Sequence, residues 1–489
     1  MRCFFLTFTP YPLPLPLTFF MTIRVVKKKG GRGAAQGEGS AARRVSASRR
    51  AAAEILRRVE DEGAYASVLL ASAGEELRAD DRALCYELVL GVLRRQLWLD
   101  RLIEHYAGRA AASLDAPVRR ALRLGLYQLR FLTRIPASAA VNESVNLAHE
   151  ARLRSAANFI NAVLRRATRE PDYDPANHAP TELERLAVST SHPAWLVARW
   201  VETFGATEAE SFAHANNRTP PVAFRVNPAR MSADEVIARL HAAGVEARPS
   251  EVAAGAWRVE SAGGASAAAQ LRALAAEGAV YLQDEASQLV AHAVGARAGE
   301  RVLDVCAAPG SKTTQIAAQA GAGALIVAGD LYGQRLRVVR ESAARQGLEN
   351  VQTVAYDAAA SPLPFAAGAF RRVLVDAPCT GTGTLRHNPE IRWRITPADI
   401  VELAARQRSI LANAARTLGV GGRLVYSTCS VEPEENEEVA AAFLETHPEF
   451  ELIRPDVPER LLTNEGAART WPQRDDTDGF FVAAFEKRG

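Results

Sequence analysis

The stretch RVLDVCAAPGSKT, Arg301–Thr313, places a short apolar run directly before a glycine-bearing loop and a polar helix start. Apolar runs of the same kind recur downstream, and stretches with helical composition separate them. Short strands that alternate with helices predict a parallel sheet with right-handed crossovers. We therefore expect an α/β, Rossmann-like domain over residues 278–489. Its further strands are expected in ALIVAGD, NVQTVAYD, RRVLVD, GRLVYS and GFFVAAFE, with helices at 312–320, 332–346 and 400–417.

Polar residues follow each of these predicted strands. Because ligands of such domains bind beyond the carboxyl ends of the strands, we expect these residues to form one site. The first loop is not a Walker A loop, since Cys306 stands where that motif has glycine and Ser311 where it has lysine. Asp330 lies twenty residues beyond Gly310, a spacing at which an acidic residue meets ribose hydroxyls. The pattern favours a nucleoside-bearing cofactor, S-adenosylmethionine, with Asp357 near the adenine amino group.

Two cysteines also follow predicted strands, Cys379 in DAPCTGTG and Cys429 in YSTCS. Neither has C-x-x-C spacing or an accompanying histidine pattern, so we expect no metal site. Cys306 is interpreted as a buried thiol that packs like a small apolar residue.

For the other two cysteines we favour chemistry on cytosine. A thiolate that adds to C6 makes C5 able to accept a methyl group from a sulfonium, and an acid that protonates N3, here Asp376, assists. A base must then remove the C5 proton. The residues alone leave open which thiol attacks, and Cys379 after Pro378 is one candidate.

Lysine is rare in this chain. Of 59 basic residues only five are lysine, and Lys312 is the only one between residues 30 and 486. A lysine in the glycine-bearing loop therefore indicates a place where arginine does not serve. The alternative is chance retention at a surface site.

The first 45 residues are expected to be a disordered basic extension, and the sequence leaves open whether translation starts at Met1 or at Met21. Four prolines within Pro10–Pro16 interrupt the helix that a signal or membrane segment needs. A membrane-associated leader is the alternative interpretation. No other apolar run approaches the roughly 20 residues that span a bilayer, and five cysteines in 489 residues indicate a reducing compartment rather than a disulfide framework.

Two further regions precede the α/β domain. Residues 46–172 show apolar positions at helical spacing and predict an all-α bundle. Arginine pairs at 94/95, 119/120 and 165/166 are expected on its outer faces, where they would contact phosphates. Residues 173–277 predict a proline-containing linker and a small α+β module, in which SADEVIARLHAAG has Ser232 as a helix N-cap.

Taken together, CAAPGSKT, Asp330, Asp357, DAPCTGTG and YSTCSVEPEEN strongly resemble the RNA 5-methylcytosine methyltransferases of the NOL/NOP/Sun group. The resemblance covers most of the chain. AAVNESVNLAHEARL and NFINAVLRR are similar to the NusB-like domain of the RsmB (Fmu/Sun) branch of that group. SHPAWLVARWVETFG and FRVNP are similar to its middle segment, and YLQDEASQLV to the start of its catalytic domain. The resemblance implies a bacterial enzyme that methylates C5 of a cytosine in small-subunit (16S) ribosomal RNA.

The resemblance also implies roles for individual residues. Cys429 becomes the nucleophile at C6, Cys379 assists product release, and Asp376 contacts the cofactor or the base. Asp330 binds the ribose and Asp357 lies near adenine. The S-adenosylmethionine site then comprises Cys306, Ala307, Ala308, Pro309, Gly310, Ser311, Lys312, Asp330, Asp357 and Asp376.

One position departs from the family pattern. Ser311 stands where glycine is usual, and a modest effect on cofactor affinity is expected, because serine reaches glycine-only backbone angles at a cost.

Two other functions stay open. A transfer-RNA cytosine-C5 methyltransferase would use the same chemistry, although the NusB-like domain argues against it. A non-catalytic RNA-binding factor with a methyltransferase-like fold is the second alternative, against which Lys312, Asp376 and both cysteines argue. We expect a cytoplasmic monomer that binds ribosomal RNA and has neither a membrane segment nor a metal.

Overall fold

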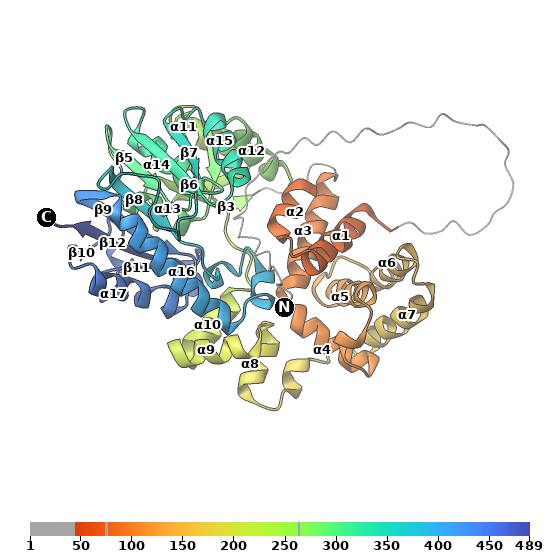
Figure 1. Cartoon of the computed structure of the whole chain (residues 1–489). Coiled ribbons are helices and arrows are strands. Elements are labelled where there is room, and N and C mark those ends of the chain that lie inside the picture. The colour runs from red at the N-terminus through yellow and green to blue at the C-terminus, as the bar shows by residue number, and fades with distance from the viewer. Residues whose placement is uncertain (1–44, 74–76, 263–264) are drawn as a thin grey trace. The chain divides into compact units, whose positions relative to one another are not determined.

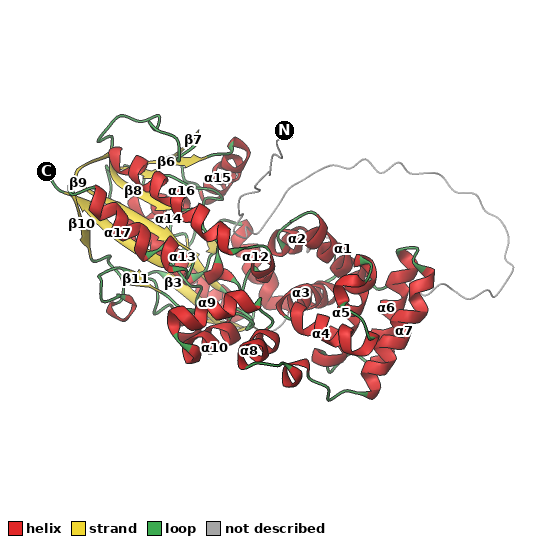
Figure 2. Ribbon diagram, turned by 60° about the horizontal axis from the view of Figure 1, so that its bottom comes forward, coloured by secondary structure: helices red, strands yellow, loops and turns green. Residues whose placement is uncertain are grey.

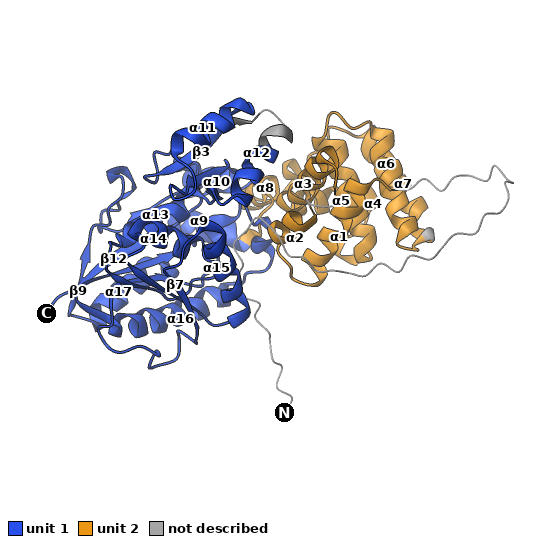
Figure 3. Cartoon of the chain, turned by 90° about the horizontal axis from the view of Figure 1, so that it is seen from above, with its two compact units in different colours: residues 1–15, 195–489 blue, residues 16–194 orange. Residues whose placement is uncertain are grey.

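The computed structural model describes residues 45–73, 77–262 and 265–489. These residues form two compact units, one through residue 194 and one from residue 195 onward (Figure 3). The extension predicted at residues 1–45 lies, except for Val45, outside the described residues.

The first unit is built from helices around one apolar core, as the helical spacing predicts. Leu88, Leu99, Leu122 and Ile160 are fully buried and come from four different helices. Within the described part of this unit no strand occurs. Its helices are α1 (Ala47–Asp61), α2 (Ala66–Ala73), α3 (Ala79–Arg94), α4 (Gln96–Ala107), α5 (Ala116–Phe131), α6 (Ala137–Glu150), α7 (Arg154–Arg169) and α8 (Glu182–Thr190).

The prediction that the arginine pairs lie on outer faces is wrong for the first two pairs. Arg94 and Arg120 are buried. Nη1 of Arg120 lies 2.9 Å from a carboxylate oxygen of Glu60, and Arg119 pairs with the same side chain. The Glu60 carboxylate, on α1, offsets part of the cost of burying the guanidinium groups of Arg119 and Arg120. Of the six arginines in these pairs, only Arg165 is exposed.

The second unit begins with a small module whose four-stranded sheet has the order β2-β3-β1-β4. Strand β1 is antiparallel to both of its neighbours. Ser232 caps helix α11 as predicted, in a reciprocal capping box with Glu235. The elements are α9 (Ala194–Phe204), α10 (Ala206–Ala215), β1 (Ala223–Val226), α11 (Ala233–Ala242), β2 (Val245–Pro249), β3 (Ala256–Ala262), α12 (Ala265–Ala276) and β4 (Val280–Leu282).

An eight-stranded sheet of order β10-β12-β9-β8-β5-β6-β7 forms the larger part of this unit, with β11 pairing β12 (Figure 1). Strands β5 to β9 run parallel, whereas β12 is antiparallel to β9. The strands are β5 (Arg301–Asp304), β6 (Leu325–Asp330), β7 (Val351–Ala355), β8 (Phe370–Asp376), β9 (Leu418–Thr428), β10 (Phe450–Ile453), β11 (Ala468–Arg469) and β12 (Phe481–Lys487).

Helices cover both faces of this sheet (Figure 2). Along β8, Val373 and Val375 join a core with α16 and α17, while Leu374 joins the opposite core with α13 and α14. Burial on both faces explains why these strands are continuous apolar runs rather than alternating ones. The helices are α13 (Glu285–Val294), α14 (Ser311–Ala320), α15 (Gly333–Gln346), α16 (Pro397–Arg416), α17 (Glu437–Thr446) and α18 (Pro472–Asp475).

Across the described residues, no helix combines the length and the apolar character that a bilayer span requires.

Candidate functional site

The carboxyl ends of the central strands bring the predicted polar residues to one edge of the sheet. Strand β5 lies between β8 and β6, and these three strands end at Asp304, Asp376 and Asp330 respectively. Cys429 directly follows β9, the other neighbour of β8. The loops after these strands therefore face a common region, as is usual for a doubly wound sheet.

The first loop turns sharply at Gly310 before α14. Its φ of 104° is a conformation that side chains disfavour, and a Cβ there would lie 3.1 Å from the backbone of Val339. The amide of Ala307 donates to the carbonyl of Gly329 at 2.7 Å, which joins the loop to the end of β6. The chain thus needs glycine at this position to bring loop and helix together.

Ser311 does not have the backbone strain that was expected. It opens α14 and is not among the described non-glycine residues with positive φ. Its hydroxyl lies 3.0 Å from that of the buried Tyr281. Serine is therefore accommodated here in ordinary helical geometry, with a partner that glycine would lack.

Asp330 and Asp357, the two predicted cofactor carboxylates, have different surroundings. Asp330 is buried, accepts the amide of Tyr332 at 3.0 Å, and pairs with Arg335 at 3.2 Å. Asp357 lies after β7 with 46% of its side chain exposed and accepts the amide of Ala359. Asp330 is held rigidly at the edge, whereas Asp357 is partly in solvent.

Asp304 belongs to the same edge, although the sequence suggested no role for it beyond ending the first strand. Its Oδ2 accepts the hydroxyl of Thr313 at 2.7 Å, and its Oδ1 is buried with no hydrogen-bond partner within the described residues. Burial raises the pKa of Asp304 to about 7, against the Thr313 hydrogen bond, which lowers it.

Lys312, in the first turn of α14, reaches the end of β8. Its Nζ lies 2.7 Å from Oδ2 of Asp376, whose Oδ1 accepts the hydroxyl of Ser427 at 2.8 Å. The ammonium also lies 5.0 Å from the ring centre of Phe480. Burial lowers the pKa of Lys312, but the facing Asp376 outweighs it and the pKa ends raised.

The two predicted reactive cysteines meet. Their sulfur atoms, Sγ of Cys379 and Sγ of Cys429, are 3.4 Å apart, and neither forms a disulfide. Cys379 is buried and Cys429 is partly exposed. The contact with the Cys429 thiol, together with burial, raises the pKa of Cys379. Cys306, by contrast, packs against the core of the sheet, and burial raises its pKa as well.

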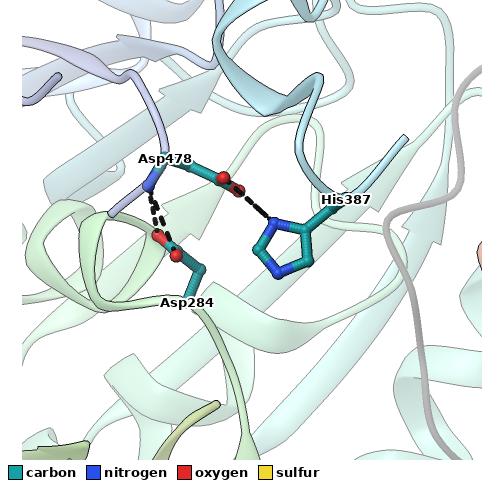
Figure 4. A group of neighbouring side chains, drawn as sticks. All are labelled: Asp284, His387 and Asp478. Atoms are coloured by element: carbon teal, nitrogen blue, oxygen red, sulfur yellow. Dashed lines mark hydrogen bonds and ion pairs between the residues drawn. The ribbon is translucent and has the colours of Figure 1, made fainter. Parts of the chain in front are cut away.

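A group of titratable side chains outside the predicted site joins three segments of the same unit (Figure 4). Nδ1 of His387 lies 3.0 Å from both carboxylate oxygens of Asp478, whose amide donates to Asp284. The hydroxyl of Thr477 also donates to Asp284, at 2.7 Å. Burial, followed by the neighbouring Asp478, raises the pKa of Asp284 to about 6. Both carboxylates accept hydrogen bonds from groups of the protein itself, and these bonds connect the three segments.

Family models match three parts of the chain. Residues 291–486 match the model described as 16S rRNA methyltransferase RsmB/F. Residues 46–169 match the NusB family, and residues 192–266 match the ferredoxin-like domain of RsmF/B-like methyltransferases.

Relatives match along most of the chain. The probable ribosomal RNA small subunit methyltransferase B of Bacillus subtilis is 35% identical over 447 residues, which cover 90% of this chain and 98% of the relative. The ribosomal RNA small subunit methyltransferase B of Pseudomonas putida is 37% identical over 450 residues, covering 90% and 98%. Among solved structures, PH0851 superposes with a TM-score of 0.77 at 30% identity and covers 90% of this chain and 98% of its own.

Proposed function

The chain belongs to the 16S rRNA methyltransferase RsmB/F family, and from that premise we propose that it methylates C5 of a cytosine in small-subunit ribosomal RNA, with S-adenosylmethionine as the methyl donor. The strongest structural support is the contact between the sulfurs of Cys379 and Cys429 at 3.4 Å, beside the Lys312–Asp376 pair. Cytosine C5 chemistry requires a nucleophile, a proton donor and a base in one place.

The edge of the sheet fits the cofactor. Oδ1 of Asp304 and Oη of Tyr356 are buried there without hydrogen-bond partners within the described residues, so the protein itself leaves two polar groups unsatisfied at this edge. Asp330 supplies a fixed carboxylate suited to ribose hydroxyls. The loop from Cys306 to Lys312, with Asp357 and Asp376, would complete the site. S-adenosylmethionine supplies an electrophilic methyl group on a sulfonium.

Cys429 is the better nucleophile of the two thiols. It is the more exposed one, while the raised pKa of Cys379 keeps that thiol protonated. In this proposal the Cys429 thiolate adds to C6 of the cytosine, and the electron pair of the C5–C6 double bond becomes available at C5.

Lys312 and Asp376 act together on the base. The Lys312 ammonium, 2.7 Å from Oδ2 of Asp376, would donate a hydrogen bond toward N3 of the cytosine, and Asp376 would hold the ammonium in place. This refines the expectation that Asp376 alone protonates N3.

Release follows once C5 is methylated. A base removes the C5 proton, the C5–C6 double bond re-forms, and the Cys429 thiolate leaves. The sulfur of Cys379 is adjacent to that of Cys429, and we assign it the role of assisting this step.

The remaining expectations join the proposal as inferences. Residues 46–172 and the module within 173–277 would bind RNA, and residues 278–489 would contain the catalytic site. Five cysteines in a chain of 489 residues favour a reducing compartment over a disulfide framework, which supports a cytoplasmic location. A monomer without a metal remains a prediction.

The direct test is transfer of tritium from labelled S-adenosylmethionine to purified 16S ribosomal RNA, with total transfer RNA as the second substrate. The proposal predicts label in ribosomal RNA at 5-methylcytosine, and none with the Cys429→Ala variant. Label confined to transfer RNA would favour that alternative substrate, and no label in either would favour the non-catalytic RNA-binding factor.

A further inference from the structure

A buried carboxylate lies next to both cysteine loops. Glu435 follows strand β9 in the run EPEEN, and its side chain is fully buried. No ion pair involves it within the described residues. A buried carboxylate without a cationic partner is unfavourable unless several donors satisfy it. The groups that donate hydrogen bonds to the Glu435 carboxylate therefore indicate which segments this side chain holds in place.

Two of these donors belong to the residue after Cys379. The amide of Thr380 donates to Oε1 of Glu435 at 2.9 Å, and the Thr380 hydroxyl donates to Oε2. Nε2 of Gln407 lies 3.0 Å from Oε1 of Glu435 and 2.9 Å from the carbonyl of Pro378. The residues on both sides of Cys379 are thus fixed to one carboxylate, directly or through Gln407.

The same network reaches the residue after Cys429. The hydroxyl of Ser430 lies 3.1 Å from that of Thr380 and 3.2 Å from that of Thr382. The amide of Gly383 donates to the carbonyl of Cys429 at 2.9 Å. Thr380, Thr382 and Ser430 are all buried, so water does not compete for these bonds.

We propose that Glu435 is a positioning residue of the methyl-transfer reaction, which holds the Cys379 loop against the Cys429 loop so that Cys379 can complete product release. This inference rests on the proposed function. It assigns Glu435 no contact with the substrate, since the carboxylate acts through Thr380 and Ser430. Removing the carboxylate takes away the bonds that fix Thr380 and Gln407 beside Cys379, while Cys429 keeps its place at the end of β9.

The protonation of Glu435 bears on the same step. Burial raises its pKa to about 7, against hydrogen bonds from Ser430 and Thr380, which lower it. The titratable groups that face Glu435 are Tyr426, whose hydroxyl donates to the Glu435 carbonyl, and Cys379; Asp376 and Lys312 lie beside the sulfurs. The part of the pH dependence of release that comes from Glu435 should therefore lie near neutrality and be absent in Glu435→Gln.

Two variants, Glu435→Gln and Glu435→Ala, are compared with Glu438→Gln, an exposed glutamate in α17 three residues further on. The first readout needs no RNA. Diamide oxidises two thiols to a disulfide and takes up their two electrons and two protons. Peptide mapping then gives the rate at which the Cys379–Cys429 disulfide forms. We expect a rate at least about tenfold lower in Glu435→Ala and unchanged in Glu438→Gln.

The second readout separates methyl transfer from release. Single-turnover methyl transfer is expected to stay within about threefold of wild type in Glu435→Gln, while a covalent protein–RNA adduct that depends on S-adenosylmethionine accumulates as in Cys379→Ala. Glu435 variants that match Glu438→Gln in both readouts would overturn the inference, as would transfer and release falling together. Absence of any adduct in Cys379→Ala is a separate result. It would count against the covalent mechanism, and the disulfide rate would still decide whether Glu435 positions the sulfurs.

Discussion

Lys312 and Asp376 form a buried ion pair with 2.7 Å between Nζ and Oδ2, although 64 residues separate them in sequence. The lysine lies in the first turn of α14, which follows β5, and the aspartate ends β8, the parallel neighbour of β5. Only 5% of the lysine side chain is exposed. The only lysine between residues 30 and 486 is therefore buried against a carboxylate. The guanidinium group of arginine is wider and would need more space at this position.

The first prediction concerns this pair. Lys312→Arg keeps the charge but should lower the rate of methyl transfer by about tenfold or more, equivalent to about 1.4 kcal/mol in the barrier. Lys487→Arg is the matched control, since Lys487 donates to the carbonyl of Leu418, at the opposite end of β9 from Cys429. Equal rates for both variants under single-turnover conditions would show that the site does not require lysine.

The second prediction concerns the cofactor. Asp330→Asn should weaken S-adenosylmethionine binding by about 1–3 kcal/mol, the range for a lost hydrogen bond to a charged group. Asp357→Asn should weaken binding less, because 46% of the Asp357 side chain is exposed and water competes there. Isothermal titration calorimetry measures both affinities. An unchanged affinity in Asp330→Asn would remove this residue from the cofactor site.

A third prediction follows from the buried Asp304. Its pKa in the folded chain is about 7, above the ordinary 3.8, so the contribution of its protonated form to stability is complete below pH 3.8 and is lost as pH rises to 7. Asp304→Asn lacks this loss. The variant should be more stable than wild type at pH 8, by up to about 4 kcal/mol, and similar at pH 4.

Chemical denaturation at several pH values measures this difference. The exposed Asp456→Asn serves as the control and should follow the wild-type curve. Asp304→Asn and wild-type curves that run parallel from pH 4 to pH 8 would contradict the burial of an unfavourable charge at Asp304.

The fourth prediction addresses RNA binding by the helical unit. Arg165 and Arg169 are exposed on α7, whereas Arg119 and Arg120 are engaged by Glu60. Replacing Arg165 and Arg169 by alanine should weaken RNA binding and reduce the magnitude of its salt slope by about one for each lost phosphate contact. Arg57→Ala, on α1, is the control because this arginine pairs with Glu54 and Glu62. Unchanged affinity and slope in the double variant would exclude this face of α7.

The sequence was sufficient to predict the main elements and the edge of the sheet at which polar residues gather. The helix expected at 332–346 is α15, Gly333–Gln346, and the one expected at 400–417 lies within residues 397–416 and the following turn. Apolar spacing predicts such elements because it reports which faces are buried.

Spacing does not report which polar groups meet across the fold. Arg120 was expected in solvent, yet it lies against Glu60, because a helix period cannot show that a carboxylate on another helix faces it. Glu435 appeared only as part of an acidic run, and the donors that make it a positioning candidate come from Thr380 and Gln407, 55 and 28 residues away. Contacts of this kind depend on how helices and strands pack against one another, which local patterns leave open.

The measurement that tests the central claim most directly is trapping of a protein–RNA adduct by the two cysteine variants. Each variant is incubated with ribosomal RNA and S-adenosylmethionine and analysed by denaturing gel electrophoresis. With Cys429 as nucleophile and Cys379 in release, Cys379→Ala should accumulate a stable adduct, while Cys429→Ala and the double variant should form none. An adduct in Cys429→Ala instead would reverse the two roles, and no adduct in either single variant would contradict covalent catalysis through this pair.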